Sequence, residues 1–211
     1  MEIGRGAQYR VDDIGGGRVR KTLLTAAESR AVYEPWHEPD GSAFDYLAQA
    51  VANAAHVQAL LAAYPELSDT LGNPDFESTT AYTQDKVHIL GEMLENISTD
   101  DARRIIRSYV SLVHTHWRYG FADRIYNPLV NSGINSHGDV ILCDFGEITF
   151  DRDVAAKSVA TTRWLRANSY IEDMPDALKP YYHDYLGEHL TAETFAANWG
   201  AALSGDPTPL Q

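Results

Sequence analysis

The stretch that decides the fold is Asn131-Ser-Gly-Ile-Asn-Ser-His-Gly-Asp-Val-Ile-Leu-Cys-Asp144-Phe-Gly-Glu147. An apolar run follows a polar turn, which predicts a hairpin over residues 134–148. Asn131 and Asp144 would flank this hairpin, which would aim both side chains at one ion. Mg²⁺ prefers such oxygen donors and takes its remaining ligands from water and substrate phosphates. The alternative is an ordinary hairpin that ends in an Asx turn.

Composition limits the class of protein. The chain has 211 residues, 44% of them hydrophobic, which suffices for one domain or two small lobes with a packed core. The formal net charge of −13 argues against nonspecific binding to nucleic acid or to an anionic membrane. A single cysteine excludes an internal disulfide framework, and no apolar run is long enough to span a bilayer. The start of the chain lacks a signal-peptide pattern, so we expect a cytoplasmic protein.

The order of predicted elements is mostly β first and mostly α afterwards, with helices inserted. We therefore expect an α+β fold of two lobes, a small β-rich lobe over residues 1–86 and a reduced helical lobe over 87–211. In the first lobe we expect a hairpin over 1–24, a helix that begins at Thr25-Ala-Ala-Glu28, a longer helix that begins at Ser42, and a strand within 79–90. After these we expect a helix from Ser98 to Gly120, a loop over 121–131, and helices after Asp153.

The motifs over roughly residues 3–150, taken in their order along the chain, resemble those of the protein-kinase-like fold. The chain looks like a compact, atypical, bacterial-style member of that fold. Asp144 lies 13 residues after Asn131 (144 − 131), which resembles kinase spacing, and the resemblance implies that both hold Mg²⁺. The segment Ile3-Gly-Arg-Gly-Ala-Gln-Tyr-Arg-Val11 resembles the glycine-rich loop G-x-G-x-x-G-x-V, with Tyr9 in place of the third glycine. Gly4 and Gly6 would then let backbone N–H groups approach the phosphates of ATP; the alternative is an ordinary turn.

Lys21 is the candidate phosphate-binding lysine. It alternates with Val19 across Arg20, so it should share the buried face of the strand with Val19. An inward lysine needs an acidic or anionic partner, and the resemblance implies phosphate oxygens. The glutamate that pairs with this lysine in kinases stays open among Glu28, Glu34 and Glu38.

The catalytic loop departs from the family pattern H-R-D-x-x-x-x-N, because Tyr126 stands five residues before Asn131 (131 − 126). Asp123 stands eight residues before Asn131 (131 − 123), so a loop longer by three residues would carry it to the acceptor hydroxyl. The alternative role for Asp123 is to brace the loop through Arg124 or backbone N–H groups. A second alternative is that Asn127 is the metal ligand and Asn131 has a structural role. His114 and His116, at i and i+2 on a predicted helix, point to different sides, which favours a bracing role over a shared metal.

The resemblance implies an ATP- and Mg²⁺-dependent phosphotransferase that acts on a hydroxyl of a protein or small molecule. An ordinary eukaryotic-type protein kinase is not expected, because only 65 residues follow Gly146 (211 − 146) and no Ala-Pro-Glu sequence is present. Two alternatives remain. The first is a nucleotide-binding pseudokinase that serves as a regulatory module, and the second is a kinase-fold nucleotidyltransferase that transfers AMP. We expect neither nucleic acid nor membrane as a partner.

Overall fold

The computed structural model describes residues 1–33, 43–166 and 174–203, and it divides into two compact units. The first unit comprises Met1–Val87, Asn135–His137 and Leu142–Glu147. The second comprises His88–Ile134, Gly138–Ile141 and Ile148–Gln211. The main break thus falls between residues 87 and 88, and two pieces of the 134–148 hairpin belong to the first unit.

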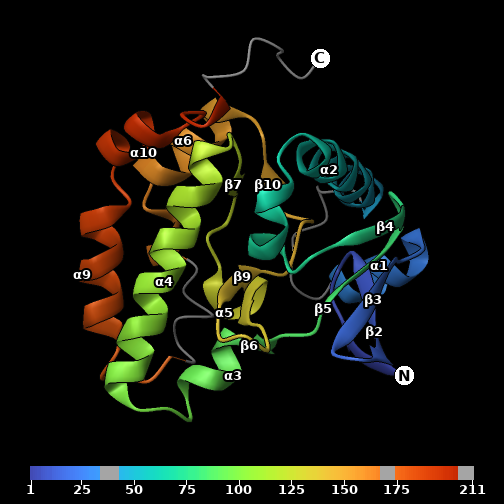
Figure 1. Cartoon of the computed structure of the whole chain (residues 1–211), viewed down its shortest axis with the longest axis horizontal. Coiled ribbons are helices and arrows are strands. Elements are labelled where there is room, and N and C mark those ends of the chain that lie inside the picture. The colour runs from blue at the N-terminus through green and yellow to red at the C-terminus, as the bar shows by residue number, and fades with distance from the viewer. Residues whose placement is uncertain (34–42, 167–173, 204–211) are drawn as a thin grey trace. The chain divides into compact units, whose positions relative to one another are not determined.

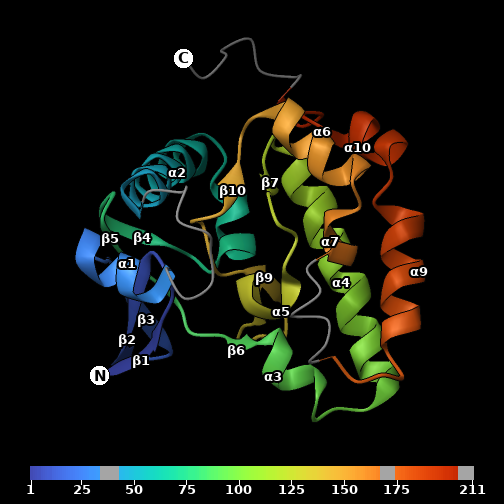
Figure 2. The same ribbon diagram turned by 180° about the vertical axis from the view of Figure 1, so that it is seen from behind.

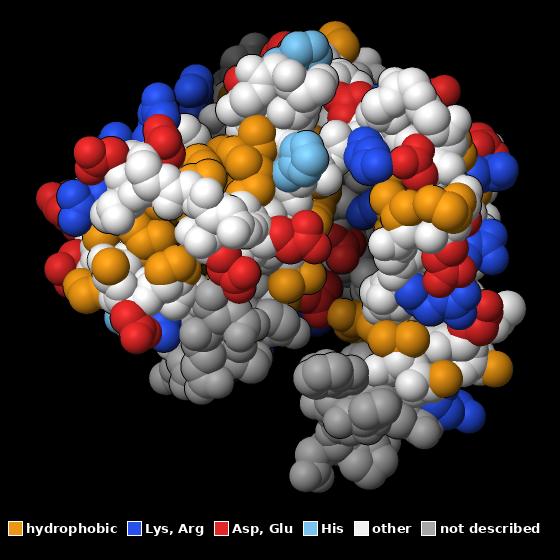
Figure 3. Space-filling view, turned by 90° about the horizontal axis from the view of Figure 1, so that it is seen from below, with side chains coloured by type: hydrophobic (Ala, Val, Ile, Leu, Met, Phe, Trp, Pro, Cys, Tyr) orange, Lys and Arg blue, Asp and Glu red, His pale blue; other side chains and the backbone are white. Residues whose placement is uncertain are grey.

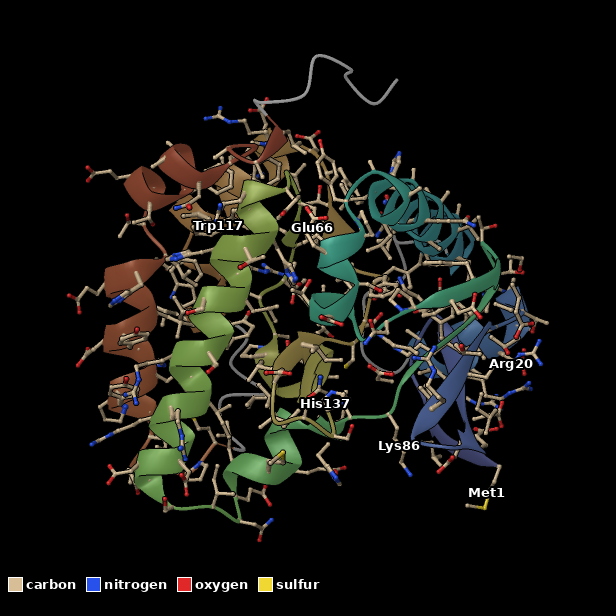
Figure 4. The ribbon with its side chains drawn as sticks, viewed as in Figure 1. Met1, Arg20, Glu66, Lys86, Trp117 and His137 are labelled. Atoms are coloured by element: carbon tan, nitrogen blue, oxygen red, sulfur yellow. The ribbon has the colours of Figure 1, made fainter. Side chains whose placement is uncertain are left out.

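A five-stranded antiparallel sheet forms the centre of the first unit, in the order β1-β2-β3-β5-β4 (Figure 1). The turn between β2 and β3 requires glycine, since Gly15, Gly16 and Gly17 all have positive φ. On β3, Val19 is buried and Arg20 is exposed and points outward (Figure 4). The strands are β1 (Glu2–Arg5), β2 (Tyr9–Gly15), β3 (Arg18–Leu23), β4 (Asp75–Ser78) and β5 (Ala81–Asp85).

Three helical segments complete the first unit: α1 (Ala26–Tyr33), α2 (Ala43–Ala63) and the 3-10 helix η1 (Pro65–Leu71). Thr25 starts α1 as the sequence predicts, since its hydroxyl accepts from the Glu28 N–H while the Glu28 carboxylate accepts from the Thr25 N–H. The long apolar helix predicted after Ser42 is α2, although Ser42 itself lies outside the described residues. Its buried face includes Ala50, Ala54, Val57 and Leu60.

The second unit is mainly helical, with two small sheets. Helices α4 and α9 pack side by side in both ribbon views (Figures 1 and 2). The strands are β6 (His88–Ile89), β8 (Ser132–Ile134) and β9 (Val140–Leu142), which form one sheet, and β7 (Ala122–Asp123) and β10 (Ile148–Thr149), which form the other. The helices are α3 (Leu90–Leu94), α4 (Thr99–Arg118), α5 (Pro128–Asn131), α6 (Arg152–Ala160), α7 (Arg163–Arg166), α9 (Lys179–His189) and α10 (Ala192–Asn198).

Helix α4 begins where the sequence predicts, because the Ser98 side chain accepts a hydrogen bond from the Asp101 N–H. Its buried face carries large apolar side chains, including Ile106, Tyr109, Val113 and Trp117. This stripe repeats every three or four residues and packs the helix against the rest of the unit.

The loop expected over residues 121–131 is partly regular, which corrects the sequence prediction. Ala122 and Asp123 form β7 by pairing with β10, and Pro128 begins the short helix α5, since its fixed φ suits a first helical position. Between them, Tyr126 has a φ of +50°, rare for a bulky residue. Tyr126 is fully buried, and its hydroxyl accepts a hydrogen bond of 3.0 Å from Trp117 Nε1.

The predicted α+β class, with an antiparallel sheet unit and a helical unit, is confirmed. No helix in the described residues is both long enough and apolar enough to cross a membrane. On the face drawn in Figure 3, Lys and Arg side chains lie among Asp and Glu side chains, and its described residues form no continuous basic surface.

The Trp117–Tyr126 hydrogen bond generates a stability prediction. Tyr126→Phe removes the acceptor of a fully buried indole N–H, and an unpaired buried donor costs about 1–3 kcal/mol. We expect urea denaturation to show a free energy of unfolding lower by about that amount. Tyr185→Phe is the control, because the Tyr185 hydroxyl has no hydrogen-bond partner among the described residues. Equal stabilities for the two variants would contradict the anchoring role of Tyr126.

Candidate functional site

Asp144 in the first unit closes an Asx turn at the end of the predicted hairpin. Its Oδ1 accepts from the Gly146 N–H at 2.9 Å, and the side chain is partly exposed. No ion pair of Asp144 is present among the described residues. Burial, and then the negative charge of Asp144, raise the pKa of the Tyr9 phenol above its ordinary value, which locates the carboxylate near β2.

The backbone around Asp144 is held by side chains that come from four different places in the first unit. All four side chains are buried and donate hydrogen bonds to carbonyl oxygens of residues 142–146. Gln84 Nε2 donates to Leu142 O at 3.4 Å, and Lys21 Nζ donates to Cys143 O. Asn53 Nδ2 donates to both Phe145 O and Gly146 O at 3.0 Å. Gln8 Nε2 donates to Gly146 O at 3.2 Å. The segment is therefore fixed mainly through its carbonyl groups, and the Asp144 carboxylate contributes one hydrogen bond, from the Gly146 N–H.

Lys21 is 8% exposed and shares the buried face of β3 with Val19, so the predicted alternation is confirmed. Its ammonium donates to a backbone carbonyl, and no carboxylate in the described part of the chain forms an ion pair with it. Of the three candidate partners, Glu28 is bound to Thr25 and Arg5, and Glu34 and Glu38 lie outside the described residues. A buried cation with only a neutral partner is costly, so this position is suited to an anion.

The two glycines of the candidate phosphate loop have no special backbone requirement. Neither Gly4 nor Gly6 has positive φ, and a Cβ at either would make ordinary contacts, at 3.9 Å to Val11 and 4.0 Å to Tyr9. The Gly6 N–H donates to Tyr9 O at 3.0 Å within the turn. Their role in phosphate binding stays a prediction.

Gly146, by contrast, is required by packing. A Cβ on Gly146 would lie 1.3 Å from Gln8 Oε1. Gln8 belongs to the segment that resembles the glycine-rich loop, so the structure brings this segment against the Asp-Phe-Gly motif.

Asp123 lies in the second unit and is buried, with 6% exposure. Its Oδ1 accepts from the Ile125 N–H at 2.9 Å, and its Oδ2 accepts from the Asn127 N–H and from Asn131 Nδ2, both at 3.3 Å. Burial raises the pKa of Asp123, and these hydrogen bonds oppose the rise. The bracing contacts to backbone N–H groups are therefore present, and the catalytic role stays a prediction.

Asn131 and Asp144 belong to different compact units, so their joint binding of a metal stays a prediction. The structure does bring Asp123, Asn127 and Asn131 together within the second unit. Among the described residues, no group of three or more His, Cys, Asp or Glu side chains is arranged to hold a metal.

His114 and His116 point to different sides of α4, as predicted. His116 is buried against the Phe121 ring, with centroids 4.5 Å apart, and burial lowers its pKa from 6.5 to about 3. His114 Nε2 contacts His189 O at 3.0 Å, on the α9 side. His114 thus contacts α9, whereas His116 packs against Phe121, at the start of the loop that follows α4.

Gln8, Asn53 and Gln84 were not identified from the sequence. Asn53 carries a detectable signal, because a lone amide stands between Ala50, Ala54 and Val57 on the buried face of α2. A polar side chain on such a face must find a buried partner. Nothing in the local sequence indicates that the partner is the Asp-Phe-Gly backbone, about 90 residues away.

Comparisons with known proteins give structural likenesses only. No protein-family model matches the sequence, and no curated protein sequence matches it. WbdD, solved with the kinase inhibitor LY294002, aligns at 15% identity and a TM-score of 0.47 over 95% of this chain and 44% of WbdD. A second structure of WbdD, a bifunctional kinase-methyltransferase, aligns at 14% identity and a TM-score of 0.44. This alignment covers 96% of this chain and 45% of WbdD.

A third solved structure, the Rv3197–erythromycin complex from Mycobacterium tuberculosis, aligns at 15% identity and a TM-score of 0.44. This alignment covers 84% of this chain and 54% of Rv3197. The chain thus spans about half the length of the proteins that it resembles. The resemblance to the kinase-like fold is one of fold alone, and these likenesses carry no information about a reaction or a substrate.

The contact between Gln8 and Gly146 can be tested by a double-mutant cycle. Gly146→Ala should lower the free energy of unfolding by about 1–3 kcal/mol, because the Gln8 amide must leave its buried hydrogen bond. The same change in a Gln8→Ala background should cost less, with a coupling of at least about 0.5 kcal/mol. Gly187→Ala on α9 is the control, since nothing lies within 4 Å of its added Cβ. Equal costs in both backgrounds would show that Gln8 is not the obstacle.

His116 generates a pH prediction. Its folded pKa of about 3 lies below the ordinary 6.5, so only the unfolded chain takes up this proton as the pH falls through that interval. The stability from this group is therefore complete above pH 6.5 and decreases toward pH 3, by at most about 1.4 kcal/mol per pH unit. Unfolding measured between pH 7 and pH 4 should show a shallower decline for His116→Phe than for the unmodified protein. The exposed His183, changed to Phe, is the control, and parallel curves for His116→Phe would refute the assignment.

Proposed function

We propose that this protein binds ATP with Mg²⁺ and transfers the terminal phosphoryl group to a hydroxyl of a protein or small molecule. The observation that supports this best is the buried Lys21 ammonium, bonded to the carbonyl of Cys143 directly before Asp144. Among the described residues it has no carboxylate partner, so an anion would compensate its charge. Phosphate oxygens of the nucleotide fit this requirement, with Gly4 and Gly6 on the adjoining loop.

The residues present fit a magnesium ion chemically. Asp144 offers a partly exposed carboxylate whose Oδ2 has no hydrogen-bond partner in the described part of the chain. By the family spacing, Asn131 offers an amide oxygen. Bound there, Mg²⁺ would neutralise charge on the phosphate oxygens.

Asp123 is proposed to orient the acceptor hydroxyl and take its proton. The acceptor oxygen forms a bond to the terminal phosphorus, the bond from that phosphorus to the bridging oxygen of ATP breaks, and ADP leaves. Burial raises the pKa of Asp123, which brings the carboxylate closer to the range in which a base is effective at neutral pH. Positioning and charge stabilisation would supply most of the rate enhancement.

A second candidate function is a nucleotide-binding module without transfer activity. It is favoured by Tyr126, which stands where the family has its base. The Tyr126 side chain is fully buried and its hydroxyl is bonded to Trp117, so it cannot replace that base.

The test is mass spectrometry of the protein and of a panel of sugars, aminoglycosides and hydroxyl-bearing peptides after incubation with ATP and Mg²⁺. A phosphoryl adduct supports the proposal, a nucleotidyl adduct supports AMP transfer, and nucleotide binding without any adduct supports the binding module. Asp123→Asn should keep nucleotide binding and lose about 10²–10⁴-fold in transfer rate. Unimpaired transfer by this variant would exclude the catalytic role of Asp123.

The metal assignment can be tested by melting temperature. ATP with Mg²⁺ should stabilise the folded state by mass action, by about 2.7 kcal/mol at one hundred times the dissociation constant. Asp144→Asn should abolish the magnesium-dependent part of this shift, because an amide is a weaker ligand than a carboxylate. The control is Asp139→Asn, an exposed carboxylate in the same hairpin. An unchanged magnesium dependence in Asp144→Asn would remove Asp144 from the metal site.

A further inference from the structure

Tyr181 on α9 lies against two arginines of α4. Arg107 Nη1 donates to the Tyr181 hydroxyl at 3.1 Å, and the Arg103 guanidinium lies over the Tyr181 ring, 5.2 Å from its centroid. All three residues belong to the second unit, in which α4 and α9 pack side by side (Figures 1 and 2). Two cationic groups of one helix therefore meet at a single phenol of the other.

The two arginines lack close carboxylates that would neutralise them. In the described part of the chain, Arg107 forms no ion pair with a carboxylate. Arg103 pairs with Asp100 at 3.9 Å, but the Asp100 side chain is 95% exposed, so this pair contributes little. Arg103 Nε is buried and has no hydrogen-bond acceptor among the described residues. Cationic N–H donors are therefore left without an anion at this surface.

Packing alone does not account for this arrangement. A cation–π contact explains why Arg103 lies over the ring, but it explains neither the unpaired Arg103 Nε nor the contact of Arg107 with the hydroxyl oxygen. The two arginines stand at i and i+4 of α4, so their charges repel each other. The chain has 30 acidic and 17 basic residues, so carboxylates are plentiful elsewhere. An anion at the Tyr181 hydroxyl would offset the repulsion and accept from both guanidinium groups.

We propose that Tyr181 is a phosphorylation site and that Arg103 and Arg107 bind the phosphate. The Tyr181 oxygen already lies at hydrogen-bond distance from Arg107, so a phosphoryl group on it brings further oxygens to the same guanidinium. Arginine matches phosphate oxygens with parallel N–H donors. Tyr181 is partly exposed and its hydrogen bond to Arg107 lies at the surface, which leaves the hydroxyl within reach of a kinase. This inference goes beyond the proposed function and does not rest on it.

The phosphoryl donor is ATP, and the catalyst is a tyrosine kinase. The Tyr181 oxygen forms a bond to the terminal phosphorus, the bond from that phosphorus to the bridging oxygen breaks, ADP leaves, and the base of the kinase takes the phenolic proton. The phosphate brings a charge of about −1.5 to −2 at pH 7 to two cationic groups. Its hydrogen bonds tie α9 to α4, the helix that leads toward the loop with Asp123.

The test is phosphotyrosine incorporated at position 181 of the full chain by genetic code expansion, with phosphotyrosine at position 185 as the matched control. Tyr185 stacks on Tyr181 one turn further along α9, and its hydroxyl has no hydrogen-bond partner among the described residues. Titration followed by ³¹P NMR should give a phosphate pKa lower by about one unit or more at position 181, because the arginines favour the dianion. Phosphorylation at 181 should also raise the melting temperature by about 2–4 °C.

The role of the arginines is measured in the protein phosphorylated at Tyr181. Arg107→Gln and Arg103→Gln should each move the phosphate pKa up toward its value at position 185, because each removes a cation from the phosphate. Arg104→Gln is the control, since Arg104 is exposed on the same helix and pairs with Asp101. It should leave the phosphate pKa unchanged.

Access to the hydroxyl is measured by peptide mass spectrometry of the unmodified protein after incubation with ATP, Mg²⁺ and a tyrosine kinase of broad specificity. We expect a phosphate on Tyr181, and its absence there would overturn the inference. Equal phosphate pKa values at positions 181 and 185 would also overturn it, as would a protein that melts lower or fails to fold once Tyr181 is phosphorylated. None of these outcomes bears on ATP binding by the first unit.

Discussion

The attachment of the Leu142–Gly146 backbone to four buried side chains is the constraint on which the first unit depends. Gln8, Lys21, Asn53 and Gln84 come from the first loop, the sheet and α2, and their hydrogen bonds end on carbonyls between residues 142 and 146. Because a buried polar group must be satisfied, none of these segments can shift without leaving a donor or acceptor unpaired. The Asp144 carboxylate is thereby left partly exposed and available to a ligand.

Each unit also buries one charge that the described residues leave without an opposite partner: the Lys21 ammonium in the first and the Asp123 carboxylate in the second. Buried charges are normally paired, because desolvation is costly. Structural stability therefore does not explain these two residues. The phosphoryl transfer proposed above would use one charge of each sign, the ammonium for phosphate oxygens and the carboxylate for a hydroxyl proton.

The sequence predicted those features of the fold that depend on residues close together in the chain. The Thr25 and Ser98 caps, the glycine turn before β3 and the inward direction of Lys21 all follow from residue type and spacing. The hydrogen-bond partner of Lys21 could not be predicted from the sequence, because Cys143 lies 122 residues further along the chain. The short strand β7 was missed for the same reason, since Ala122 and Asp123 become a strand only by pairing with Ile148 and Thr149.

We propose that the buried Lys21 ammonium binds a phosphate of the nucleotide. Calorimetric titration of ATP with Mg²⁺ into the unmodified protein and into Lys21→Met tests it most directly, since methionine fills a similar volume without the charge. Because Lys21→Met also removes the hydrogen bond to Cys143 O, circular dichroism of the variant is needed to check that it remains folded. The account predicts at least about tenfold weaker ATP binding by Lys21→Met, equivalent to about 1.4 kcal/mol. An unchanged affinity would contradict it.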